Sequence, residues 1–289
     1  NSLMYTDPRG KEQVQTLVNR LGFENIMKDT GLPAHHMYTI GKIMWIKENL
    51  PAVYDRTWKF LLYGDYVNYK LTGLTVIDYS LASRTMAMNV VDKKWEAKIF
   101  DAADVDRHMF SDISPSGRII STVKQEIAEE LGLLPTTLVV TGGHDQACAA
   151  LGGGILKKGL AIDSMGSVEC ITPLISSPVF NSAMLHYRYN YSPHVQEGQY
   201  LTFAVCFSGG SLLKWYRDSF ASHLINEAKR TGKSIYQLLD EKAAEHPTDL
   251  IVIPHFAGSG TPHMNANSKG AILGISYDTQ SKHVYRALM

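Results

Sequence analysis

The sequence predicts an α/β protein with two domains. Its 289 residues are enough for two ordinary domains, each with a hydrophobic core. After residue 154 the pattern runs through three strands, two helices, a strand, a long loop and another strand, which is typical of an α/β domain. Before that point, an apolar run at 136–143 is followed by small residues that permit close packing of a strand against a helix. We therefore expect domains at 1–154 and 155–289.

Helices dominate the expected first domain. Val14, Leu17, Val18 and Leu21 recur at helical spacing, and Gly22 is a suitable stop. Further helices are expected before Pro51 and within residues 64–73, 96–105 and 123–133. Gly73 is expected to end the helix within 64–73, and Gly132 the helix within 123–133. Residues 75–91 mix loop with short extended pieces, and residues 136–143 form the clearest buried strand.

The expected second domain alternates strands and helices. Two strands flank a Met-Gly-Ser turn at 165–167, and a third strand ends at the Ser-Gly-Gly-Ser segment 208–211. The remaining elements are helices within 211–220 and 234–246, a buried strand at 249–256, a loop at 257–270 and a strand at 270–276. The loop is long enough to have a function beyond connecting its neighbours.

Composition excludes several classes of protein. Lys plus Arg and Asp plus Glu number 28 each, so the formal net charge is zero and no basic stripe suggests a nucleic acid or membrane partner. No run of 18 apolar residues indicates a membrane span. The three cysteines, Cys148, Cys170 and Cys206, are far apart in apolar surroundings, as expected for buried thiols of a cytoplasmic protein. No metal-ligand spacing or P-loop motif occurs, so we expect no metal ligands in this chain.

Asp145 is the main candidate for chemistry. It follows the predicted strand at 136–143 and is surrounded by glycines and alanines, which allow a ligand to approach the backbone closely. A carboxylate there can accept the proton of an alcohol that becomes a nucleophile. It is also suited to cap the N-terminus of the following helix, where Asp is among the favoured residues. The residues alone leave both interpretations open.

Two glycine-containing segments are candidates for phosphate binding. Gly166 and Ser167 offer backbone N–H groups and a hydroxyl, but an ordinary hairpin turn has the same composition. The segment 208–211 precedes a helix whose N-terminus suits a phosphate, while Ser211 alone suits an N-cap.

The order of these motifs resembles the FGGY carbohydrate kinases, a family of sugar and polyol kinases in the actin-like ATPase superfamily. The segment MYTIGKIMWIKEN resembles the family's first signature, and GAILGISYDTQSKHVYRALM resembles its second. Between them, DYSLASRTMAMNV, GGHDQACAALG, DSMGSVECI and SGGSLLKWYRD follow the family order and spacing. The resemblance covers nearly the whole chain. It implies two ribonuclease-H-like domains with a cleft between them, both incomplete in this sequence.

The resemblance also implies roles for individual residues. Asp145 matches the family's catalytic base, which takes the proton of the acceptor hydroxyl as that oxygen attacks the γ-phosphoryl of ATP. Tyr5, Asp7 and Arg9 match the segment that lines the sugar pocket, with Tyr5 in place of the usual Trp, and Tyr38 matches a further aromatic of that pocket. Asp145 thus also counts among the substrate-binding residues.

On the nucleotide side, Gly166 and Ser167 match the second phosphate motif, and Gly210 matches a glycine close to the nucleotide phosphates. The cofactors implied are ATP and Mg²⁺, and the substrate is a ketopentose, ketohexose or sugar acid. Glycerol or another polyol as acceptor, and a non-catalytic sugar-binding relative, are the alternatives. The family's Asp-x-Gly-Thr-Thr loop and later adenosine segment have no match here. We therefore expect this chain alone to be inactive as a kinase, and either to pair as a homodimer or to be poorly soluble.

Overall fold

The computed structural model describes residues 2–4, 7–265 and 267–289. Tyr5, predicted to line the substrate pocket, lies outside these residues. The chain forms two compact units, of which the first comprises residues 1–162 and 173–203 and the second residues 163–172 and 204–289. The segment 173–203 therefore packs with the first unit although it follows residue 155 in sequence. A domain boundary near residue 155 remains a prediction.

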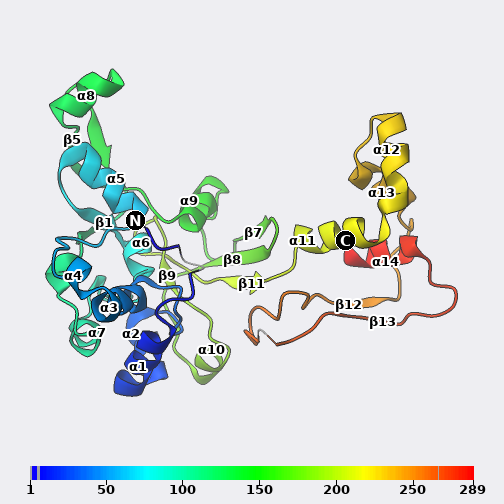
Figure 1. Ribbon diagram of the computed structural model, residues 1–289, viewed down its shortest axis with the longest axis horizontal. Helices are drawn as coiled ribbons and strands as arrows, with labels where there is room; N and C mark the ends of the chain where they lie inside the picture. Colours follow the sequence, from blue (N-terminus) through cyan, green and yellow to red (C-terminus); the bar gives the residue numbers. More distant parts are fainter. Residues whose placement is uncertain (1, 5–6, 266) are drawn as a thin grey trace. The chain divides into compact units, whose positions relative to one another are not determined.

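The first unit is rich in helices, several of which lie side by side (Figure 1). Its helices are α1 (Lys11–Leu21), α2 (Phe23–Thr30), α3 (Thr39–Asn49), α4 (Pro51–Tyr54), α5 (Tyr63–Thr72), α6 (Tyr79–Ser83), α7 (Ala97–Ala103), α8 (Gln125–Leu131), α9 (Asp145–Gly152) and α10 (Ser182–His186). A 3-10 turn, η1, covers Arg107–Met109. The stops expected at Gly22, Gly73 and Gly132 are confirmed, each with a positive φ that favours glycine.

Short strands connect these helices. They are β1 (Val76–Asp78), β2 (Met88–Asn89), β3 (Lys94–Trp95), β4 (Asp112–Ser114), β5 (Ile119–Thr122), β6 (Leu138–Val140), β9 (Ser192–Pro193) and β10 (Tyr200–Leu201). β1 pairs with β4 in parallel, while β2 with β3 and β5 with β6 are antiparallel. β10 pairs with β9 and with Leu174 and Ile175 at the end of β8 (Glu169–Ile175). The core lies among α1, α2, α3 and α7, around Leu17, Ile26 and Ile40.

The second unit contains two groups of paired strands and a group of helices. Its strands are the end of β7 (Ala161–Met165), the start of β8, β11 (Ala204–Cys206), β12 (Ile251–Ile253) and β13 (Ala271–Leu273). Its helices are α11 (Gly210–Phe220), η2 (Ser222–Leu224), α12 (Ile225–Thr231), α13 (Ile235–Lys242) and α14 (Ser281–Leu288). In the first group β8 pairs with β7 as well as with β11, and in the second β12 pairs with β13. Tyr216 of α11 and Tyr285 of α14 are buried side by side, with their ring centroids 5.3 Å apart.

Several sequence expectations need correction. The strand at 136–143 forms as β6, but only Val139 is buried, because β6 pairs with β5 at one side of the first unit and leaves Leu138 and Val140 exposed. The expected buried strand at 249–256 is likewise short and partly exposed. The thiols are not core groups, since Cys148 is exposed and Cys170 and Cys206 are partly buried.

One buried carboxyl in this fold gives a testable pH dependence. Asp65 of α5 is 1% exposed, and the Ser111 hydroxyl donates to its Oδ2 at 2.5 Å. Burial raises the pKa of Asp65 from 3.8 to about 6. The folded protein therefore holds this proton more tightly than the unfolded chain, and the Asp65 contribution to stability is lost as the pH rises from about 4 through 6.

We expect Asp65→Asn to remove this dependence, because the amide does not ionise. The free energy of unfolding of the variant minus that of the wild type should increase between pH 4 and pH 7, by on the order of 3 kcal/mol. Urea denaturation of the complete protein at both pH values measures it. Asp101→Asn, at an exposed position of α7, is the control and should show no such increase. A pH-independent difference for Asp65→Asn would contradict the assignment.

Candidate active site

Asp7 and Arg9, both predicted to line the sugar pocket, form an ion pair close to α3. Nε of Arg9 donates to both carboxylate oxygens of Asp7, at 2.8 and 3.0 Å, and Nη2 of Arg9 donates to Oδ2. These bonds hold the pKa of Asp7 well below its usual value. At neutral pH the pair therefore presents a carboxylate and a guanidinium in fixed positions, groups that bind sugar hydroxyls.

Helix α3 supplies the support for this pair. Tyr38 is its N-cap residue, and Lys42 and Trp45 follow four and seven positions later, so the three side chains share one helix face. Nζ of Lys42 donates to the backbone oxygen of Asp7 at 2.7 Å, and the Arg9 guanidinium lies 5.0 Å from the centroid of the Trp45 ring. Burial lowers the pKa of Lys42. The segment that carries Asp7 and Arg9 is thus fastened to α3.

Tyr38 itself has little free surface. It is 4% exposed and belongs to the core of the first unit, and the guanidinium carbon of Arg84 lies 5.0 Å from its ring centroid. Arg84, which the sequence analysis did not select, is the C-cap residue of α6 and forms no ion pair or side-chain hydrogen bond within the described residues. The backbone N–H of Ile40 donates to the oxygen of the adjacent Thr85 at 3.0 Å, which ties α3 to the end of α6.

The other end of α6 holds the segment around Asp145. The N–H of His144, the residue before Asp145, donates to the Ser80 hydroxyl oxygen of α6 at 2.8 Å. Helix α6 therefore contacts the start of α9 through Ser80, and the two residues that follow it, Arg84 and Thr85, contact the start of α3. A helix of five residues thus connects the Asp7 and Tyr38 region with the candidate base inside one unit.

Asp145 is the first residue of α9, and its N-cap is His144 rather than Asp145. Its side chain is 85% exposed, and its Oδ1 accepts the N–H of the adjacent Gln146 at 2.7 Å. The capping interpretation is not realised, because an N-cap oxygen accepts from the second or third residue of the helix. No Lys or Arg pairs with this carboxylate within the described residues.

His144 is neutral beside Asp145. Its Nε2 lies 3.4 Å from Oδ1 of Asp145, but burial, and then the nearby charge of Arg84, lower the pKa of His144 to about 4. The imidazole therefore carries no charge at neutral pH and does not neutralise the carboxylate. Its ring meets that of Phe203 edge to face, with centroids 6.5 Å apart.

In the second unit, the predicted phosphate residues form one interlocked turn. The Gly210 N–H donates to the Gly166 oxygen at 2.7 Å, and the N–H groups of Gly209 and Ser211 donate to the Ser167 oxygen at 3.2 Å each. A Cβ on Gly210 would lie 2.9 Å from the Gly166 oxygen, so this contact requires glycine. Gly209, not Ser211, is the N-cap of α11.

These bonds change how a phosphate could be held. The first N–H groups of α11 are already used by the turn, whereas Gly166 and Ser167 are exposed and the Ser167 hydroxyl has no hydrogen bond among the described residues. The structure thus brings Gly166, Ser167 and Gly210 together, and the Ser167 hydroxyl is the group that fits a phosphate oxygen.

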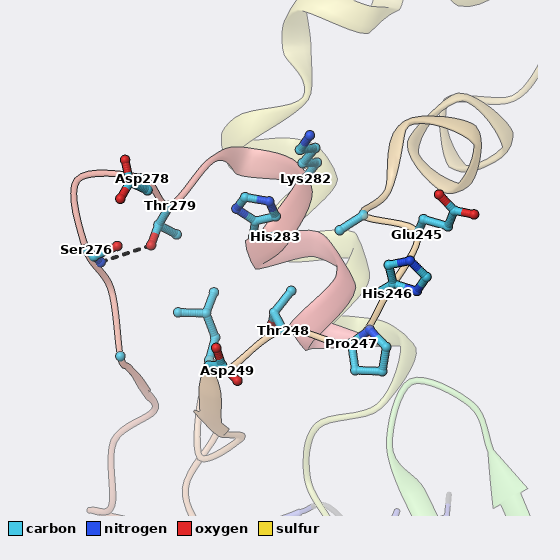
Figure 2. Close-up of a pocket in the computed structure, with 13 residues that line it drawn as sticks. Glu245, His246, Pro247, Thr248, Asp249, Ser276, Asp278, Thr279, Lys282 and His283 are labelled. Atoms are coloured by element: carbon cyan, nitrogen blue, oxygen red, sulfur yellow. Dashed lines mark hydrogen bonds between the residues drawn. The ribbon is translucent and has the colours of Figure 1, made fainter.

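A cavity of about 420 Å³ lies elsewhere in the second unit. Figure 2 shows Glu245 and His246, from the segment after α13, at the right and Ser276 and Thr279 at the left, with Lys282 and His283 of α14 between them. The Ser276 N–H donates to the Thr279 hydroxyl at 2.9 Å along its wall (Figure 2). None of the catalytic, substrate-binding or nucleotide-binding residues predicted from the sequence lines this cavity, although part of its wall comes from the segment 270–289 that resembles the second family signature.

The described part of the chain contains no group of three or more His, Cys, Asp or Glu side chains that could hold a metal ion. Across the same residues, no helix has both the length and the apolar character needed to cross a membrane.

Both halves of the chain match one family of known proteins. Residues 1–152 match the N-terminal domain, and residues 164–289 the C-terminal domain, of the FGGY family of carbohydrate kinases. The chain is 30% identical to a xylulose kinase of Lactococcus lactis, over 100% of this chain and 55% of the relative. It is 28% identical to a gluconokinase of Bacillus licheniformis, over 99% of this chain and 56% of the relative.

A solved structure supports the fold. The glycerol kinase of Plasmodium falciparum with ADP superposes with a TM-score of 0.84 at 19% identity, covering 100% of this chain and 56% of that one. The chain thus has the two-domain fold of the actin-like ATPase superfamily, as the sequence predicts, and spans a little over half the length of these relatives. On the family matches over both halves, this chain belongs to the FGGY family of carbohydrate kinases.

Proposed function

We propose that the complete protein is an ATP-dependent carbohydrate kinase that phosphorylates a hydroxyl of a ketose or sugar acid. The observation that carries the proposal is the unpaired carboxylate of Asp145, which α6 connects to the Asp7, Arg9 and Tyr38 region of the same unit. The family match and the names of the xylulose kinase and gluconokinase relatives support this class of acceptor.

In the proposed reaction, Asp7 and Arg9 bind hydroxyls of the acceptor and hold it against the first unit. An oxygen of Asp145 takes the proton of the reacting hydroxyl as that oxygen forms its bond to the γ-phosphorus, and the bond to the leaving diphosphate oxygen breaks. ATP supplies the phosphoryl group. Ser167 donates its hydroxyl to a phosphate oxygen of the nucleotide, and the Gly166 and Gly210 contact holds the Ser167 turn in shape.

Mg²⁺ stays an expectation from the resemblance. The described residues bring together no group of three or more His, Cys, Asp or Glu side chains. We therefore assign no step to the ion, and the roles above belong to side chains of this chain alone.

A panel of acceptors tests the proposal. The complete protein, with ATP, should phosphorylate either D-xylulose or D-gluconate with a kcat/KM at least about 10²-fold above that for glycerol, because a site built for several hydroxyls leaves polar groups unpaired with a smaller acceptor. Chromatographic measurement of the sugar phosphate formed gives the kcat/KM for each acceptor. Preference for glycerol would contradict the acceptor class, and no transfer to any of the three would contradict the proposed activity for these acceptors.

A further inference from the structure

The contact between Ser80 and His144 joins segments that are 64 residues apart in sequence. Ser80 is fully buried in α6, and its hydroxyl oxygen accepts the N–H of His144 at 2.8 Å. His144 is the N-cap residue of α9, so this single bond fixes the position at which the helix begins. The next residue is Asp145. A contact made from a different helix therefore holds the backbone directly before Asp145.

Ser80 is in turn held by a buried carboxylate. Oδ1 of Asp78 accepts the Ser80 hydroxyl, the Ser80 N–H at 2.9 Å and the Leu81 N–H at 3.2 Å, and so caps α6. Because the Ser80 hydroxyl donates its proton to Asp78, its oxygen lone pairs face His144 as an acceptor. A hydrogen bond to a charged partner also strengthens the next bond in the chain. Asp78, Ser80 and the His144 backbone thus form one continuous buried chain.

The neighbouring glycine shows that the approach is close. A Cβ on Gly143 would lie 3.2 Å from the Ser80 hydroxyl oxygen, 3.1 Å from Sγ of Cys148 and 2.2 Å from a methyl carbon of Val195. A side chain at position 143 would therefore force this segment or the Val195 side chain to move. By contrast, a Cβ on Gly142 would have nothing within 4 Å.

We propose that Ser80, held by Asp78, is a positioning residue for the catalytic carboxylate of Asp145. Ser80 does not touch the acceptor. It acts by fixing the first turn of α9, so that the carboxylate lies where it can take the acceptor proton. This inference rests on the proposed role of Asp145 as general base, and a displacement of about 1 Å in such a group lowers turnover by about 10²-fold.

The test compares two buried serines of the same helix in the complete protein. Ser83, also fully buried in α6, donates to the Ser80 backbone oxygen at 2.8 Å and contacts the Ser192 hydroxyl at 2.9 Å, but it makes no hydrogen bond to α9. We expect Ser80→Ala to lower kcat by roughly 10- to 100-fold with the acceptor KM within about 2-fold. Ser83→Ala should lower the melting temperature by about as much as Ser80→Ala does, because each variant loses a buried hydroxyl. Its kcat should stay within about 2-fold of the wild type.

A second readout follows the contact itself. Exchange of the His144 amide hydrogen should be faster in Ser80→Ala than in Ser83→Ala, because only the former removes its acceptor. Asp78→Asn keeps the size of the cap but not its charge, and should lower kcat by about 3- to 10-fold. If Ser80→Ala does not fold, the kcat of Asp78→Asn is the measurement that tests the proposal.

Each outcome has a separate meaning. Equal kcat values in the two serine variants, or wild-type kcat in Asp78→Asn where Ser80→Ala does not fold, would overturn the positioning role. The proposed function has its own reference, since Asp145→Asn removes the base directly. Full activity of Asp145→Asn would refute the base, whereas an inactive Asp145→Asn together with an unaffected Ser80→Ala would refute the positioning role alone.

Discussion

Replacing Asp145 by Asn is expected to lower kcat of phosphoryl transfer by about 10²- to 10⁴-fold in the complete protein, the usual contribution of a general base. The amide has the size of the carboxylate and cannot take the proton of the acceptor. Folding should be unaffected, because the N-cap of α9 is His144 and the Asp145 side chain is 85% exposed. Initial rates of sugar phosphate formation and a thermal melt measure the two effects.

The matched control for this variant is Asp101→Asn. Asp101 is an exposed aspartate of α7 in the same unit and has no ion pair among the described residues. Its kcat should remain within about 2-fold of the wild type. A change in kcat as large as that of Asp145→Asn would show a general effect of charge rather than loss of a base. A drop in melting temperature for Asp145→Asn alone would instead return that residue to a structural role.

Gly143→Ala is expected to have the largest effect on stability near the candidate site. The added methyl would meet a methyl carbon of Val195 at 2.2 Å, well inside van der Waals contact, so the 142–145 segment or its neighbour must move. Overpacking of this kind costs about 1–3 kcal/mol. Movement of the 142–145 segment would separate His144 from Ser80, and kcat should then fall as well. Denaturation and initial-rate measurements on the complete protein test both effects.

The adjacent glycine provides the control. A Cβ on Gly142 has nothing within 4 Å, and Gly142 is not among the glycines with positive φ, so Gly142→Ala should leave both stability and kcat close to the wild type. Equal stability and equal kcat in Gly143→Ala and Gly142→Ala would show that the close approach of this segment to α6 and Val195 contributes to neither property.

The sequence predicts the larger elements because their patterns are local. The apolar spacing of α1, the prolines and glycines that end α3, α5 and α8, and the Met-Gly-Ser turn between β7 and β8 all depend on neighbouring residues. Helix α6 was not expected, since five residues are too short to show a helical period. It is stabilised by the Asp78 cap and by tertiary contacts that no local pattern displays.

In the candidate site, too, residues that belong to local motifs could be predicted, and residues that act through distant contacts could not. Asp145, Asp7 and Arg9 were selected as residue types at motif positions, which requires no knowledge of packing. Ser80 and Arg84 were missed because their importance comes from contacts with segments distant in sequence, namely His144 and Tyr38. A signal was present, since Asp78 followed two residues later by Ser80 is a typical N-terminal cap.

The measurement that tests the central claim most directly is a crystal structure of the complete protein with its acceptor bound. The proposed function predicts that an oxygen of Asp145 lies about 2.6–3.2 Å from the hydroxyl that is phosphorylated, with Asp7 or Arg9 on other hydroxyls of the same molecule. The opposite result would be an acceptor bound to Asp7 and Arg9 whose reacting hydroxyl contacts Asp145 neither directly nor through one water. That result would contradict the proposed function.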